Sequence, residues 1–305
     1  VLSNSAWIVS ERVVRALIGF GLGVWVARYL GPESYGVLGF AIAWISLFAG
    51  LAQLGLKEVC VRELVAQPEA TSAILGTSGL LRLAGGIAAL LLALATYGLF
   101  YGWSDQTQLL CIVVVGASQV VLGFEVIEWW FRSRVESKRA FRARTRGFLV
   151  ASAARVGLLA AGASTVWIAG TTLLDAVFGG LFLLFGFAKH PQRPTALVAH
   201  GQTAKRLLQE SWPNILSGIA IMVFRRIDQV MIASILGHAE VGIYGVTLRV
   251  SEIWYVVPLA IAQSMTPSIV QSRQRNDGSY ERQLLRLVSL LFWLSMAVAM
   301  VVAAI

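Results

Sequence analysis

The pattern of hydrophobic positions divides the chain into long apolar segments separated by shorter polar stretches. Nine segments hold about 20 predominantly apolar residues each, the length that a helix needs to cross a hydrocarbon core. None shows the alternation of polar and apolar residues typical of a transmembrane barrel strand, so we expect a helical bundle. The nine segments are Ala6–Leu30, Gly36–Leu56, Ile74–Phe100, Gln108–Phe131, Gly147–Val166, Gly170–Phe187, Trp212–Leu236, Val241–Ile269 and Leu284–Ile305.

Composition supports an all-α integral membrane protein. Hydrophobic residues make up 57% of the chain and charged residues 13%, and the mean hydropathy is +0.72. A soluble domain typically contains about 25% charged residues. The apolar segments are also too many and too long for a soluble core, so a soluble fold is excluded.

The basic residues predict the orientation of the chain. Of the 25 Lys and Arg, 17 lie in four alternate loops or at their edges: Lys57 and Arg62; Arg132, Arg134, Lys138, Arg139, Arg142, Arg144 and Arg146; Lys189, Arg193, Lys205 and Arg206; Arg273, Arg275, Arg282 and Arg286. The intervening turns contain none. By the positive-inside rule these four loops and the N-terminus are cytoplasmic. We therefore expect a multi-pass membrane protein with a cytoplasmic N-terminus, a topology that for a bacterial protein means the cytoplasmic membrane.

The densest basic run, Arg132–Arg146, also fits a nucleic-acid interface, because clustered Lys and Arg attract phosphate. Membrane topology already requires such a run between two spans. We therefore expect no nucleic-acid partner and a weak affinity for the anionic headgroups of membrane lipids.

An internal repeat indicates how the spans are organised. The stretch Leu30–Gly39 and the stretch Leu236–Gly245 both read Leu-Gly, four residues, Gly, two residues, Gly, at an offset of 206 residues. Six spans separate the copies, and an even number makes the repeats parallel, related by an axis along the membrane normal. The repeat predicts a six-helix lobe over residues 1–188, a cytoplasmic linker over 189–211, and a second lobe over 212–305 that holds only three spans. We expect the chain to be a fragment whose second lobe is incomplete.

The same residues carry a family resemblance. Ala27–Gly36, Arg226–Ile232, Leu236-Gly237 and Gly242–Tyr244 resemble the bacterial polysaccharide flippases, the exporters of O-antigen and related lipid-linked oligosaccharides in the multidrug/oligosaccharidyl-lipid/polysaccharide exporter superfamily. The resemblance implies two parallel six-helix lobes around a central cavity, alternating access, and a polyprenyl-pyrophosphate-linked oligosaccharide as substrate. It also implies other polysaccharide-assembly membrane proteins as partners.

Eight basic residues lie inside the predicted spans: Arg12, Arg15, Arg28, Arg82, Arg155, Arg225, Arg226 and Arg249. An Arg at the bilayer centre costs about 2.5–3.5 kcal/mol, so such residues usually face a cavity or a partner. Arg225 and Asp228 are three apart and can pair, whereas Arg226 shares its helix face with Gln229. We expect Arg226 to line the cavity, with Arg225 and Gln229 as further substrate-binding candidates.

Three more arginines are candidates for contact with an anionic lipid-linked glycan. Arg249 lies three residues before Glu252, and a local ion pair between them is the alternative role. Arg12 and Arg15 share one helix face, either at the mouth of the cavity or reaching the interface. Pro258 removes a backbone donor within its span, which predicts a hinge.

The remaining charged residues in the spans have more ordinary interpretations. Arg82 and Arg155 are expected to reach the cytoplasmic interface, and Arg28 the external one. Glu125 and Glu128 share a helix face and are expected to pair with the basic loop rather than relay protons.

Two other functions remain open. A drug or cation antiporter of the same superfamily would bind cations at Asp228, Glu252 or Asp175, although arginines outnumber carboxylates at these depths. A membrane glycosyltransferase or polymerase needs room outside the bilayer, and the external turns are short. No nucleophile elbow, P-loop, dinucleotide fingerprint or zinc spacing is present, so we expect no enzyme activity, cofactor or metal.

Overall fold

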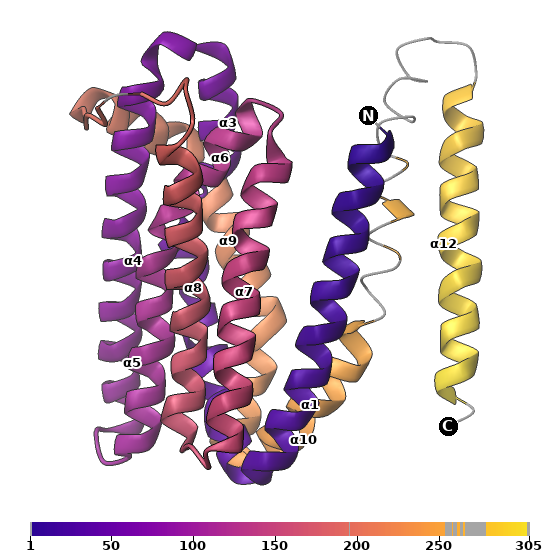
Figure 1. The fold of residues 1–305 in the computed structure, drawn as a ribbon. Coiled ribbons are helices and arrows are strands. Elements are labelled where there is room, and N and C mark those ends of the chain that lie inside the picture. The colour runs from indigo at the N-terminus through magenta and orange to yellow at the C-terminus, as the bar shows by residue number, and fades with distance from the viewer. Residues whose placement is uncertain are drawn as a thin grey trace. The chain divides into compact units, whose positions relative to one another are not determined.

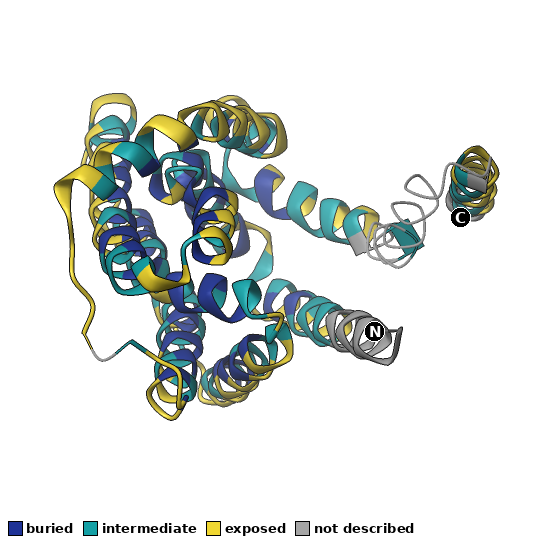
Figure 2. Ribbon diagram, turned by 90° about the horizontal axis from the view of Figure 1, so that it is seen from above, coloured by how far each residue is buried: buried dark blue, intermediate teal, exposed yellow. Residues whose placement is uncertain are grey.

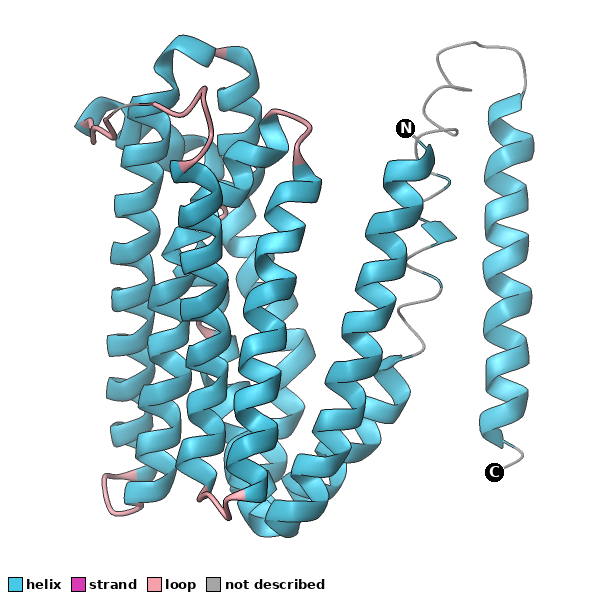
Figure 3. Cartoon of the chain, in the orientation of Figure 1, coloured by secondary structure: helices cyan, strands magenta, loops and turns pink. Residues whose placement is uncertain are grey.

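The chain is helical, as the hydrophobic pattern predicts. The computed structural model describes residues 2–194, 196–253, 258, 261–262, 265 and 279–303, and no strand occurs among them (Figure 3). The helices (Figure 1) are α1 Leu2–Leu47, α2 Ala49–Gln53, α3 Leu56–Ala66, η1 Pro68–Ala70, α4 Thr71–Tyr101, α5 Gln106–Val121, η2 Leu122–Phe124, α6 Glu125–Ser133, α7 Ser137–Ala160, α8 Thr165–Ala188, α9 Gly201–Leu236, α10 His238–Ile253 and α12 Ser279–Ala303.

Contacts divide the chain into two compact units. The larger unit is Val24–Gly245, and the smaller one combines Val1–Gly23 with Val246–Ile305. These units follow contacts within the chain and do not coincide with the lobes expected from the repeat. The lobe boundaries at residues 188 and 212 therefore stay a prediction.

Several helices are long and apolar enough to cross a membrane. Four pass a test of length and composition: Pro68–Tyr101, Gln106–Ser133, Thr165–Ala188 and Tyr280–Met300. The pair Arg15–Leu47 and Ala49–Ala66, bent by 49°, passes as a fifth. The chain is thus a multi-pass membrane protein. The predicted spans Gly147–Val166 and Trp212–Leu236 fall on α7 and α9, which carry several arginines each and are not among the helices that pass.

The larger unit is a bundle in which α4, α5, α7 and α8 run side by side (Figure 1). Its buried residues gather toward the inside of the bundle and its exposed residues lie on the outer faces of the helices (Figure 2). Small residues allow the closest approach: a Cβ at Gly147 of α7 would lie 2.4 Å from the backbone nitrogen of Gly179 of α8. Glycine at such positions is the usual means by which membrane helices bring their backbones together.

Two predicted loops are partly helical, which corrects the sequence interpretation. In the run Arg132–Arg146, α6 extends to Ser133 and α7 begins at Ser137, so Arg132 and the five basic residues from Lys138 onward lie on helices. In the predicted linker, α9 begins at Gly201 and buries Leu207. The helical parts, residues 137–146 and 201–211, are polar enough to resemble loops, but they contain no proline and tertiary packing holds them helical.

The non-helical part of the linker lies against the start of α4. The hydroxyl of Ser72 donates to the carbonyl of Ala196, and the backbone N–H of His200 donates to the Thr77 hydroxyl at 3.0 Å. Gly76 makes room, since a Cβ there would lie 2.5 Å from the carbonyl oxygen of Val198. This segment is therefore docked on the bundle.

The two copies of the glycine repeat contact each other. A Cβ at Gly36 would lie 1.7 Å from the carbonyl oxygen of His238, and a Cβ at Gly242 would lie 2.1 Å from the carbonyl oxygen of Pro32. Gly242 and His238 follow Gly36 and Pro32 by the repeat offset of 206 residues, so the contact is reciprocal. Reciprocal contacts between equivalent residues are the mark of a two-fold relation. The repeat read from the sequence is therefore a packing motif.

We predict that Gly242→Ala lowers the melting temperature of the purified protein by about 5 °C, since overpacking costs about 1–3 kcal/mol. Gly79→Ala is the matched control, because nothing lies within 4 Å of a Cβ at that helical position. Alanine favours a helix over glycine by about 1 kcal/mol, so the control should melt at or above the wild-type temperature. Equal melting of the two variants would contradict the steric argument.

Candidate functional site

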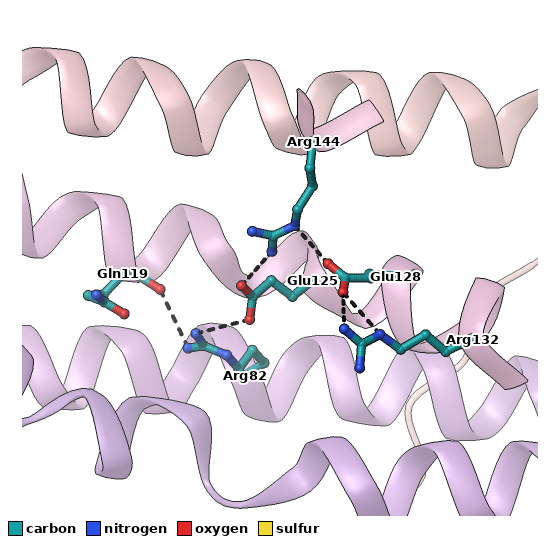
Figure 4. Close-up of polar contacts among 6 residues, drawn as sticks. All are labelled: Arg82, Gln119, Glu125, Glu128, Arg132 and Arg144. Atoms are coloured by element: carbon teal, nitrogen blue, oxygen red, sulfur yellow. Dashed lines mark hydrogen bonds and ion pairs between the residues drawn. The ribbon is translucent and has the colours of Figure 1, made fainter. Parts of the chain in front are cut away.

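Charged side chains meet inside the larger unit, at the junction of α4, α6 and α7 (Figure 4). Arg82 comes from α4, Glu125 and Glu128 from the first turn of α6, and Arg144 from α7. Arg132, one turn after Glu128, completes the group. We call these five residues the charge network.

Glu125 and Glu128 are the shared acceptors of the charge network. Arg144 reaches both: its Nη2 pairs with Glu125, and its Nε lies 2.7 Å from Glu128 Oε2. Arg132 donates to Glu128 Oε1 from Nε at 3.1 Å and from Nη2 at 2.8 Å. The expected pairing of these two glutamates with the basic run is confirmed.

Arg82 is completely buried, which corrects the expectation that it reaches the interface. Its Nη1 donates to the carbonyl of Ala52 at 2.7 Å, and its Nη2 lies 3.8 Å from Glu125 Oε2. Its Nε has no hydrogen-bond partner among the described residues. A buried cation held this way depends on the carboxylate beside it, because desolvation of an unpaired charge costs several kcal/mol.

Local structure explains why the two glutamates lie where they do. The 3₁₀ turn η2 interrupts the predicted span Gln108–Phe131, so α6 starts anew at Glu125. Carboxylates in the first turn of a helix interact favourably with its dipole. Gly123 in that turn brings it close to α4, since a Cβ there would lie 2.8 Å from a Leu83 methyl group.

The second group of charged residues lies on α9, where the sequence places its main candidates. Arg225 is exposed and Arg226 half-buried, whereas Gln229 is buried. Asp228 accepts a hydrogen bond from the Tyr244 hydroxyl of α10. Tyr244 was not among the candidates, although it belongs to the repeated motif. The Arg225–Asp228 pair and the substrate-binding roles stay predictions.

In the smaller unit, Arg249 and Glu252 of α10 and Arg15 of α1 are half-buried. The guanidinium of Arg249 packs on Gly23 of α1, where a Cβ would lie 1.5 Å from Nη1. Arg249 is thus held against the helix that carries Arg15.

The other expectations have mixed outcomes. Arg155 donates a hydrogen bond to the Thr171 hydroxyl at 2.7 Å. Arg28 is exposed. Asp175 is close enough to Arg144 to interact with it electrostatically. The side chain of Arg12 lies outside the described residues. Pro258 is described as an isolated helical position, and its neighbours 254–257 and 259–260 lie outside the described residues, so the hinge stays a prediction.

Comparison with known families gives a match over most of the chain. A family model described as polysaccharide biosynthesis protein matches residues 1–273. No curated protein matches the chain. The resemblance stated from the motifs is confirmed at the level of the family.

Solved structures share the fold. An inward-facing multidrug resistance MATE family transporter of the MOP superfamily has a TM-score of 0.71 at 22% identity, covering 93% of this chain and 68% of its own. An outward-facing MATE family transporter has a TM-score of 0.63 at 21% identity, covering 96% and 70%. A MOP superfamily transporter from Pyrococcus furiosus, described as having a binding pocket of reverse polarity, has a TM-score of 0.61 at 20% identity, covering 95% and 70%.

We predict that Glu125→Gln lowers the free energy of unfolding by about 3 kcal/mol, because loss of one partner leaves a buried charge uncompensated. Unfolding of the detergent-solubilised protein, followed by tryptophan fluorescence, measures the change. Glu58→Gln is the control, since Glu58 is 78% exposed and pairs with Lys57 at 3.9 Å, and an exposed pair contributes at most about 1 kcal/mol.

A second variant distinguishes lost pairing from lost packing. Combining Arg82→Met with Glu125→Gln removes the completely buried cation together with its carboxylate, and should be less destabilising than Glu125→Gln alone. Additive losses in the double variant would contradict the role given to Glu125.

Proposed function

The chain belongs to the polysaccharide biosynthesis protein family, and from this premise we propose that it exports a polyprenyl-pyrophosphate-linked oligosaccharide from the cytoplasmic to the outer leaflet. Its MOP superfamily transporter fold supports membrane export in general. The identity of the substrate rests on charge. Arg226, half-buried near the middle of the predicted span Trp212–Leu236 and next to the exposed Arg225, is the observation that carries the proposal.

The pyrophosphate of this substrate is difficult to bring into the membrane, and arginine lowers the free-energy cost. Moving a bare pyrophosphate into hydrocarbon would cost on the order of 20 kcal/mol per ion by the Born argument. Guanidinium groups in a wet cavity replace the lost hydration with charge-assisted, bidentate hydrogen bonds to phosphate oxygens. The polyprenyl tail stays in the lipid. An inside-negative potential also favours outward movement of negative charge, by about 2.3 kcal/mol per charge per 100 mV.

The second candidate function is export of drugs or other cations, favoured by the likeness to MATE family structures. Such a transporter needs an accessible carboxylate. Asp228 on α9 is half-buried, and its carboxylate already accepts the Tyr244 hydroxyl. Two arginines lie within one turn of it. A cation approaching Asp228 would therefore meet positive charge, which is why we favour an anionic substrate.

We predict that Arg226→Gln and Arg249→Gln each reduce surface polysaccharide by at least about tenfold, the effect expected when charged hydrogen bonds to phosphate are lost. The assay complements a strain that lacks its own exporter and measures polymer at the cell surface. Arg28→Gln makes the same charge change at an exposed site and should export like the wild type. Normal export by both test variants, at matched protein levels, would refute the proposal.

The antiporter alternative predicts a different phenotype. Asp228→Asn should then abolish resistance to cationic drugs in a sensitive strain, whereas the arginine variants should leave resistance intact. Under our proposal the wild-type protein confers no drug resistance, so the Asp228→Asn variant has none to lose. Resistance conferred by the wild type and lost in Asp228→Asn would establish the alternative.

A further inference from the structure

Contacts between α7 and α8 fix the depth of the basic residues on α7. Gly147 touches Gly179, and Arg155 bonds to Thr171, so the two antiparallel helices keep one register over several turns. This register sets Arg146 level with Gly180 and Arg142 level with Leu184. Because α8 ends at Ala188, Arg142 and Arg146 lie about 6 Å and about 12 Å inside that end, at 1.5 Å per residue.

The end of α8 marks the membrane boundary on the predicted cytoplasmic side. Thr165–Ala188 passes the test for a membrane span, and the next residue is Lys189. The Lys189 ammonium lies 4.1 Å from the centre of the Phe185 ring, an exposed aromatic residue. A lysine folded along the apolar end of a span is typical of snorkelling at the interface. The backbones of Arg142 and Arg146 therefore lie deeper than that of the interfacial Lys189.

Both arginines are exposed on the outer face of α7. The next residues along that face are Leu149, 48% exposed, and Val150, 38% exposed. Arg144, between the two arginines, points inward and pairs with Glu125 and Glu128. In contrast, no described residue forms an ion pair or hydrogen bond with the side chain of Arg146, and among the same residues the side chain of Arg142 reaches only the carbonyl of Lys138, at 3.4 Å.

We propose that Arg142 and Arg146 form a binding site for the phosphate group of a membrane lipid. Residues four apart on a helix are neighbours, with Cβ atoms about 6 Å apart, so both guanidinium groups can reach one phosphate or the two halves of a pyrophosphate. Each guanidinium offers parallel N–H donors that match phosphate oxygens. Such an anion stabilises an exposed cation whose backbone lies below the interfacial level, and the lipid tails can follow Leu149 and Val150.

The site differs from the cavity arginines in position and role. Arg226 lies on α9, whereas Arg142 and Arg146 lie on α7 beside an apolar, exposed surface. A lipid held there has its phosphate at the depth of the charge network. The substrate of the proposed function is itself a lipid pyrophosphate, so binding of that lipid at this site rests on the proposed function. Binding of an ordinary anionic phospholipid does not depend on it.

The test counts lipids bound to the purified protein by native mass spectrometry. The protein is titrated with phosphatidylglycerol and, separately, with a polyprenyl pyrophosphate. We predict that the double variant Arg142→Gln/Arg146→Gln weakens binding of at least one of them by about tenfold or more, as expected for two lost charge-assisted contacts. The variant Arg142→Lys/Arg146→Lys, which keeps the charge, should retain more binding than the Gln variant.

A matched control separates a site from a general effect of charge. Arg193→Gln/Lys189→Gln removes the same charge from exposed residues at and beyond the end of α8 and should bind both lipids within twofold of the wild type. Wild-type binding by the α7 Gln variant, once its melting temperature shows that it is folded, would overturn the proposal. An equal loss in the control would overturn it as well.

The two lipids distinguish the source of the phosphate. Loss of polyprenyl pyrophosphate binding alone identifies a docking point for the transported lipid, whereas loss of both identifies a general anionic headgroup site, and either result supports the proposal. Because no transport is measured, failure of the export experiment with Arg226→Gln leaves this result standing. Conversely, normal lipid binding by the α7 variant leaves the export proposal untouched.

Discussion

The high cost of an unpaired charge in a low-dielectric medium governs this structure. Arg82 is completely buried, and its environment provides one carboxylate and one close backbone carbonyl. Glu125 must therefore be present, and it lies there because η2 ends one helix and starts another at that residue. The break in the span places Glu125 in the first turn of α6, where the helix dipole also favours a carboxylate. Arg144 turns inward for another reason, because it pairs with Glu125 and Glu128.

Features that depend on local pattern could be predicted from the sequence. The spans, the helical class and the family follow from apolar runs and motif residues close together in the chain. The pairing of Glu125 and Glu128 with the basic run could be predicted, but the place of Arg82 in the charge network could not, because Arg82 and Glu125 are 43 residues apart and only tertiary packing brings them together. The helical start of α7 was missed for another reason: hydropathy cannot distinguish a charged helix from a charged loop, and arginine and lysine are good helix formers.

The glycine repeat shows how much a short motif can specify. In the sequence the motif indicates a duplication. In the structure Gly36 contacts the second copy of the motif, and Gly242 contacts the first. Equivalent residues that pack reciprocally must remain small in both copies, since a side chain in either one meets the backbone of the other. One steric requirement therefore explains both the motif and the pairing of the two repeats. A larger residue in either copy would disturb the contact with the other.

The arginines differ in what compensates their charge. Arg144 and Arg146 are two residues apart, so their side chains point about 200° apart around α7. One meets two glutamates that the fold supplies, and the other faces outward beside leucine and valine. A charge that the protein compensates itself is structural, because a ligand would have to displace its partner. A charge left at depth for the surroundings to compensate is available to a ligand, and in a membrane the abundant anion is phosphate. The arginines that bind substrate or lipid should therefore be sought among those that the fold leaves accessible.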